Sequence, residues 1–287
     1  MFIQSILDLF GFATETSYNF LTQDLTAFAP SVALAMENIN AGLQAFSYAL
    51  LVILTLWNVV RTAGSYVELK RPEHVFKLFV RFILSKYAIG VAWKLVNGIF
   101  AITGALIIKV FTTSGLTDGN MWAGITAPNF DDTGILKIIS NLMAVINPLS
   151  QIPSLLLGLI GFIVAVVLSV TLLLTVIGRF FKIYLFAAMS PIPLATFGSE
   201  STHSIGQNFL KSFAGVSLEG LTVGLALIVF SAYCQSPVID LSGLGIFQWI
   251  GDAAEEMAYM YSLIFNMLLL LGIIKGADQV THKIFGM

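Results

Sequence analysis

The sequence has little charge and almost no cysteine. Charged residues make up only 10% of its 287 residues, and 57% of the chain is hydrophobic, whereas soluble domains carry about 25% charged residues. This balance excludes an ordinary soluble domain, because the chain has too few charged groups to cover a water-exposed surface. The single cysteine, Cys234, excludes an intrachain disulfide and a cysteine-based metal site.

Residue groupings typical of enzymes are also missing. The three histidines, His74, His203 and His282, are scattered without metal-ligand spacing to any carboxylate. No glycine-rich phosphate loop of the Walker type occurs, so an energy-driven process would need a motor from another protein. We therefore expect a protein that is not an enzyme and that uses no cofactor and no metal.

The apolar residues fall in blocks of about twenty, the length that crosses roughly 30 Å of hydrocarbon at 1.5 Å per residue. This pattern predicts an all-α, polytopic helical bundle with about five transmembrane helices. It also predicts an N-terminal amphipathic helical region and a Pro-broken re-entrant or kinked segment. The expected spans are 42–60, 87–111, 152–178, 215–234 and 257–275, the third of them stopped by Arg179 and Lys182.

Composition divides the chain into four stretches. The first is an interfacial helical region with a break at Pro30, and its first twelve residues lack the Lys or Arg of a cleavable signal peptide, so we expect the N-terminus to be retained. The third is a polar central extracytoplasmic loop with a moderately apolar helix at 135–146. The stretches are 1–40, then 41–111 with the first two spans and a basic cytoplasmic loop 61–86, then 112–151, then 152–287 with the Pro-broken segment 180–214.

The positive charges decide the number of spans. Five spans with the N-terminus outside and the C-terminus in the cytoplasm leave eleven Lys and Arg residues inside, against Lys137 alone outside. A sixth span through the Pro-containing stretch is the alternative, and it would move Lys211, Lys275 and Lys283 outside. The eleven inside residues are Arg61, Lys70, Arg71, Lys77, Arg81, Lys86, Arg179, Lys182, Lys211, Lys275 and Lys283.

The basic stretch 61–86 allows two interpretations. Helix is expected to resume after Pro72, and Lys77 and Arg81 lie four residues apart among apolar residues, which describes an amphipathic entry into the bilayer. Its charge favours orientation and contact with anionic lipids. The alternative is a docking site for an acidic partner or a nucleic acid.

Two ionisable residues fall inside predicted spans. Lys94 and Glu219 each lie a few residues from the cytoplasmic end of a helix, where a charge costs at least about 2.5 kcal/mol on insertion scales. They line a polar pathway or pair with each other across the bundle, or else Lys94 extends to the headgroups while Glu219 caps a helix. The pairing hypothesis predicts that their alanine substitutions are non-additive.

A longer block carries a family resemblance. The stretch RFFKIYLFAAMSPIPLATFGSESTHSIGQNFLKSFAGVSLEGLTVG, residues 179–224, contains AMSPIPLATFG followed by NFLKSFAGVSLEG. It resembles the TrbL-like polytopic membrane subunits of conjugative type IV secretion systems, particularly those of Gram-positive mobile elements. The positions that match and that we treat as pore-adjacent or structural are Pro191, Pro193, Gly198, Asn208, Phe209, Gly215 and Glu219.

The resemblance implies a channel or scaffold subunit in the bacterial cell membrane. Such a subunit would form a homo-oligomer and work with other membrane subunits, a coupling protein and separate ATPases to pass DNA and relaxase. A small-molecule transporter or permease is the alternative, and it would show broken helices at matching positions of two halves. A passive assembly scaffold without a conduit is a further alternative.

Overall fold

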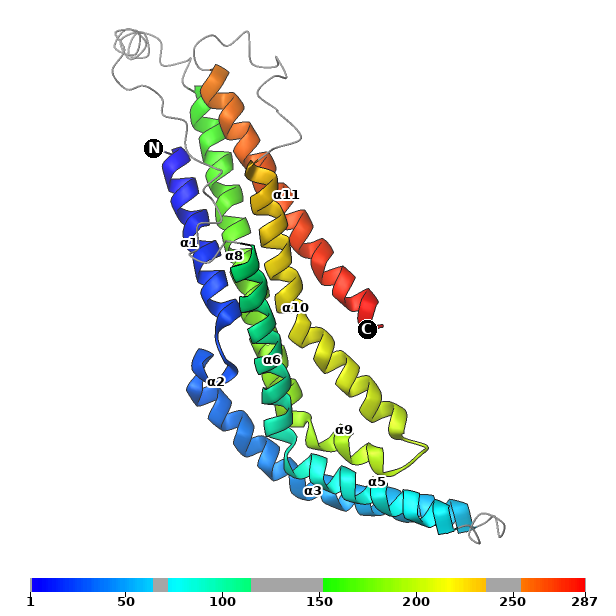
Figure 1. Ribbon diagram of the computed structural model, residues 1–287. Coiled ribbons are helices and arrows are strands. Elements are labelled where there is room, and N and C mark those ends of the chain that lie inside the picture. The colour runs from blue at the N-terminus through cyan, green and yellow to red at the C-terminus, as the bar shows by residue number, and fades with distance from the viewer. Residues whose placement is uncertain (1, 64–71, 115–151, 236–253, 287) are drawn as a thin grey trace. The chain divides into compact units, whose positions relative to one another are not determined.

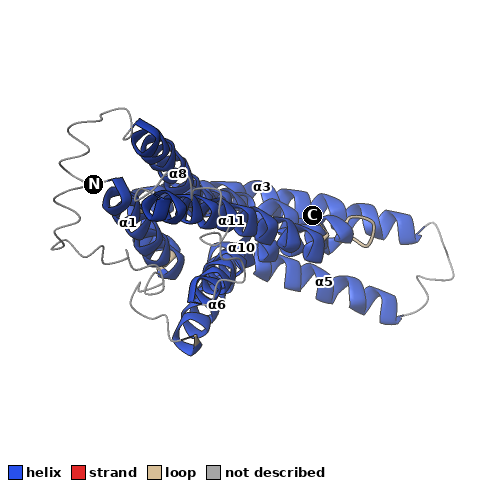
Figure 2. Ribbon diagram, turned by 90° about the horizontal axis from the view of Figure 1, so that it is seen from above, coloured by secondary structure: helices blue, strands red, loops and turns tan. Residues whose placement is uncertain are grey.

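The computed structural model describes residues 2–63, 72–114, 152–235 and 254–286, and all regular structure among them is helical (Figure 2). Figure 1 shows the elements along the chain and labels the α-helices. They are α1 (Phe2–Thr22), α2 (Leu25–Phe28), α3 (Pro30–Ala63), α5 (Pro72–Gly90), α6 (Ala92–Thr113), α8 (Ile152–Met189), α9 (Pro191–Ala195), the short 3-10 helix η2 (Thr196–Gly198), α10 (His203–Gln235) and α11 (Ala254–Phe285).

Five of these helices are long and apolar enough to cross a membrane, which confirms the predicted all-α class and the number and order of the spans. The break expected at Pro30 is present, because α3 begins there, and the helix expected to resume at Pro72 is α5, which begins at that proline. The expected helix at 135–146 lies outside the described residues. The five candidate spans are Pro30–Arg61, Ala92–Ser114, Gly158–Met189, His203–Tyr233 and Tyr261–Phe285.

The third span does not end where the sequence suggested. Arg179 and Lys182 were expected to stop it, but α8 continues through both residues to Met189 and is 38 residues long. At 1.5 Å per residue this helix measures about 57 Å, well beyond the roughly 30 Å of hydrocarbon. The continuous apolar run after Arg179 favours helix over a stop, so both cations lie within a helix rather than in a loop.

The chain forms two compact units, and α1, α6, α8, α10 and α11 each contribute residues to both. In the unit made of 21–108, 177–221 and 279–287, α3 and α5 run side by side in Figures 1 and 2, and both contact α9. The core that these helices share is apolar and almost fully buried. It consists of Leu51, Ile89, Ala92, Leu194 and Ala195.

The other unit, made of 1–20, 109–176 and 222–278, is held by close contacts at small residues. Phe111 is fully buried, and its ring meets that of Tyr18 edge-on with centroids 4.9 Å apart. A Cβ added at Gly224 would lie 3.1 Å from the Phe111 ring, so the glycine leaves room for that ring. Such small-residue contacts are typical of membrane helices, whose association depends on close packing rather than on hydrophobic burial.

We expect Phe111→Ala to destabilise this unit by about 3 kcal/mol, because it removes a buried ring and leaves a cavity. The measurement is thermal unfolding of the purified chain in detergent. Ile108→Ala, which shortens an exposed side chain on the same helix, is the matched control and should leave the melting temperature nearly unchanged. Equal losses in the two variants would contradict the packing role of Phe111.

Candidate functional site

The proline-containing break after α8 is the first feature of the candidate site. Pro191 has no backbone N–H, so it cannot donate to the carbonyl of Ala187 four residues earlier, and α8 ends at Met189. Pro191 is instead the first residue of α9, a position where its missing donor causes no loss. The structure therefore has an interrupted helix at the place where the sequence predicted a broken segment.

The Ala187 carbonyl, which Pro191 cannot bond, accepts hydrogen bonds from another helix and from Ser190. Asn40 of α3 is buried, and its side-chain Nδ2 donates to the Ala187 carbonyl at 2.7 Å and to Ser190 Oγ at 3.0 Å. The Ser190 hydroxyl also donates to the Ala187 carbonyl at 2.8 Å. These bonds remove the cost of several kcal/mol that an unsatisfied peptide group carries in apolar surroundings.

A second side-chain contact fixes α8 just before the break. The hydroxyl of Tyr184, which is buried, donates to the Leu25 carbonyl in α2, and it lies 3.4 Å from the Ala29 carbonyl. The short helix α2 ends at Phe28, so its last carbonyls need partners from outside the helix. Tyr184 and Asn40 together hold α8 against the chain on both sides of Pro30.

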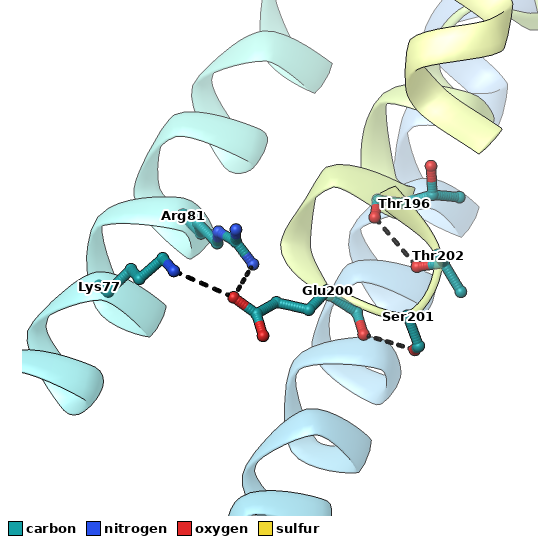
Figure 3. Close-up of polar contacts among 7 residues, drawn as sticks. Lys77, Arg81, Thr196, Glu200, Ser201 and Thr202 are labelled. Carbon is teal, nitrogen blue, oxygen red and sulfur yellow. Dashed lines mark hydrogen bonds and ion pairs between the residues drawn. The ribbon is translucent and has the colours of Figure 1, made fainter. Parts of the chain in front are cut away.

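The turn after η2 is joined to α5 through an acidic side chain (Figure 3). Glu200 Oε1 lies 2.9 Å from Arg81 Nη1 and 3.2 Å from Lys77 Nζ. The Thr202 hydroxyl donates to the Thr196 carbonyl at 3.0 Å and closes the turn. More than half of the Lys77 and Glu200 side chains is exposed, so these pairs fix the turn in place but add little stability.

Glu219 of α10 is the acidic member of a charge cluster that it forms with Lys182 and Arg179 of α8. Its side chain is 6% exposed, and its two carboxylate oxygens accept hydrogen bonds from Lys182 Nζ at 2.8 and 3.2 Å. The Lys182 side chain is 47% exposed. The pair therefore places the carboxylate inside the protein and the ammonium group at its surface.

Arg179, one turn before Lys182 on α8, is the most unusual residue of this cluster. It is 1% exposed, and none of its three guanidinium nitrogens has a hydrogen-bond partner among the described residues. Its Cζ lies 5.0 Å from the ring centre of Phe100 and 5.6 Å from that of Phe180. The two rings supply cation–π attraction, which is worth roughly 2 kcal/mol when desolvated and only partly replaces lost hydration.

The guanidinium group reaches α10 because residue 220 is glycine. A Cβ at this position would overlap the Nη1 and Cζ atoms of Arg179. Gly220 follows Glu219 directly, and the Glu219 carboxylate attracts the Arg179 charge. Two cations of α8 and one carboxylate of α10 thus lie together inside candidate membrane spans, where charged groups are rare and usually functional.

The predicted site residues divide into those at the break, those along α10 and one elsewhere. Pro191 and Gly198 are buried at the break, and a Cβ at Gly198 would overlap Leu51 of α3. Lys94 is exposed in the first turn of α6, and Glu219 pairs with Lys182, so the hypothesis of a Lys94–Glu219 pair is wrong. The others are Pro193, partly buried in α9; Asn208, exposed; Phe209, packed against Phe186; and Gly215, buried in α10.

Four contributors were missed by the sequence: Arg179, Lys182, Asn40 and Tyr184. The two cations were assigned to a stop signal, although the apolar run that follows them indicated that they lie inside a helix. Their spacing of three residues places them on neighbouring parts of one helix surface. Nothing in the sequence around Asn40 or Tyr184 indicates their long-range partners, since these lie well over a hundred residues away.

The chemistry of the site is that of charge and hydrogen bonding. Within the described residues no group of three His, Cys, Asp or Glu side chains could hold a metal ion. The five apolar spans and the charges buried among them decide the class of protein. The chain is a multi-pass helical membrane protein. Searches of protein-family models, curated proteins and solved structures give no match to it.

Removing the donor of Asn40 should destabilise the break. We expect Asn40→Ala to lower the free energy of unfolding by about 1–3 kcal/mol, because the Ala187 carbonyl loses a buried partner. Asn40→Asp should be worse, since a carboxylate oxygen would face that carbonyl. Thermal unfolding in detergent is the measurement, with the exposed neighbour Asn38→Ala as control; an Asp variant as stable as wild type would contradict this role.

Adding a methyl group at residue 220 should displace Arg179. We expect Gly220→Ala to cost about 1–3 kcal/mol, the usual cost of overpacking, because the guanidinium is enclosed and must leave its place. Gly178→Ala on α8, where a Cβ meets nothing within 4 Å, is the matched control. Thermal unfolding of both variants is the test, and equal stability of the two would show that Arg179 moves away without cost.

Proposed function

We propose that this chain is a membrane channel or scaffold subunit of a conjugative type IV secretion machine, helping to pass a DNA–protein substrate across the bacterial cytoplasmic membrane. The observation that carries the proposal is the TrbL-like block of residues 179–224. Most of this block lies in one compact unit, where it contains both the proline break and the charge cluster. Residues that give the resemblance therefore also give the unusual features of the fold.

The proposal includes an orientation and a set of partners. The distribution of Lys and Arg along the sequence places the N-terminus outside and the C-terminus in the cytoplasm. The subunit would form homo-oligomers and depend on separate ATPases and a coupling protein, because the sequence has no nucleotide-binding loop. Other membrane subunits, the transferred DNA with its relaxase, and membrane lipids are the remaining partners.

The arrangement of helix breaks favours this proposal over a small-molecule permease. A permease of the inverted-repeat type would have broken helices at matching positions of two halves. Where α5 gives way to α6, Val91 N still donates to the Tyr87 carbonyl and Leu95 N to the Val91 carbonyl, so helical hydrogen bonding continues. At Pro191 one helical bond is lost: Leu194 N still donates to the Ser190 carbonyl, but the Ala187 carbonyl accepts from the side chains of Asn40 and Ser190 instead of from residue 191.

The test is a mating assay in cells that carry the chain's own transfer machinery. Deleting the chain should abolish DNA transfer, and the full-length chain supplied in trans should restore it. A photoreactive amino acid at Asn208, which is exposed on α10, should crosslink to the transferring DNA. The same probe at Leu174, an exposed apolar position of α8, should not.

The outcomes separate the alternatives. Loss of transfer on deletion, without DNA crosslinks at Asn208 or at other exposed positions of 185–220, would favour a passive scaffold. Transfer that continues normally in the deletion strain would overturn the assignment to the secretion machine. DNA transfer and crosslinking are measured in the same cells. The amount of each variant in the membrane fraction is the control for expression.

A further inference from the structure

The surface around Lys182 is suited to lipid. Its ammonium belongs to a side chain that is 47% exposed, whereas its neighbours on α8, Phe181 and Leu185, are apolar and 53% and 60% exposed. Exposed apolar side chains on a membrane-spanning helix face acyl chains. A lysine among them extends toward the headgroups, where phosphate is the available anion.

The carboxylate that pairs with Lys182 has a second cation within its surroundings. Glu219 is almost fully buried, and the guanidinium of Arg179 packs against the α10 backbone at the next residue, Gly220. Arg179 has five N–H donors and stays charged in proteins, yet its nitrogens have no hydrogen-bond partner in the described parts of the chain. The Glu219 carboxylate is therefore the shared counter-ion of Lys182 and Arg179. Its hydrogen bonds go to Lys182, although Arg179 is the more deeply buried cation.

A movement of Glu219 from Lys182 to Arg179 would give the buried guanidinium its missing hydrogen bonds. A buried cation is strongly destabilising without a paired acceptor, and a planar guanidinium binds a carboxylate through two parallel hydrogen bonds. If Glu219 turned to Arg179, the buried charge would be paired, and Lys182 would be left as a half-exposed ammonium at the lipid surface. An anion reaching Lys182 from the membrane would then give two cations and two anions.

We propose that Lys182 is a binding site for the phosphate of an anionic phospholipid, and that Glu219 moves from Lys182 to Arg179 when the lipid binds. The exchange makes and breaks only ion pairs and hydrogen bonds. An anionic lipid is favoured over a zwitterionic one, because the phosphate of the latter is already accompanied by its own ammonium group. This site is independent of the proposed role in secretion, since it depends only on the charge cluster and the exposed face of α8.

The test uses the full chain, purified in detergent and titrated with phosphatidylglycerol or phosphatidylcholine, with bound lipid counted by native mass spectrometry. The wild-type chain should bind phosphatidylglycerol more tightly than phosphatidylcholine. Lys182→Gln should weaken phosphatidylglycerol binding about fivefold, the effect of one cation near a lipid surface. Lys94→Gln, which removes an exposed cation from α6, is the matched control and should have no comparable effect.

Two further variants test the exchange. Glu219→Gln removes the competing carboxylate, so it should strengthen phosphatidylglycerol binding about fivefold. Arg179→Gln removes the second partner of Glu219 and should weaken binding, because the carboxylate then stays on Lys182. If Arg179→Gln does not fold, the opposite effects of Lys182→Gln and Glu219→Gln decide the matter. Unchanged affinity in either of those two variants, or equal effects of Lys94→Gln and Lys182→Gln, would overturn the proposal.

Discussion

The hydrogen bond from Asn40 to the Ala187 carbonyl is the contact on which the break in α8 depends. Pro191 removes the donor that would extend α8, and in apolar surroundings the freed carbonyl needs a partner from within the protein. The Ser190 hydroxyl and Asn40 of α3 both donate to it, and the Asn40 bond requires α3 to lie against the end of α8. The packing of α3, α5 and α9 around Leu51 and Leu194 then follows in the same unit.

The charge cluster shows that buried ions, like buried carbonyls, need partners from within the protein. Arg179 is enclosed by Phe100, Phe180 and Gly220, which leave room for a large cation, but no described part of the chain accepts a hydrogen bond from it. Glu219 is close enough to attract Arg179, but it is bonded to Lys182. Removing Glu219 together with its cationic partners would destabilise the protein less than removing Glu219 alone, because an unpaired buried charge is more destabilising than a buried pair. The presence of three charges in an otherwise apolar region favours a functional role.

Much of the fold could be predicted because lipid restricts the possible structures so strongly. Blocks of about twenty apolar residues gave five spans in the right order, and Pro30, Pro72 and Pro191 marked positions where helices begin. The site was predicted less well. The sequence marks Glu219 as unusual but favours Lys94 as its partner, because both fall in predicted spans, whereas Lys182 follows the predicted end of the third span.

The sequence by itself determined the class of structure, the number of spans and the place where one helix is broken. These depend on local quantities: the length of apolar runs and the missing N–H of proline. Only the tertiary structure decided which groups meet there, namely Asn40 with Ala187, Tyr184 with Leu25, and Glu219 with Lys182. Those contacts join residues far apart along the chain, and their choice depends on helix length and rotation, which a pattern of hydrophobic and charged residues leaves open.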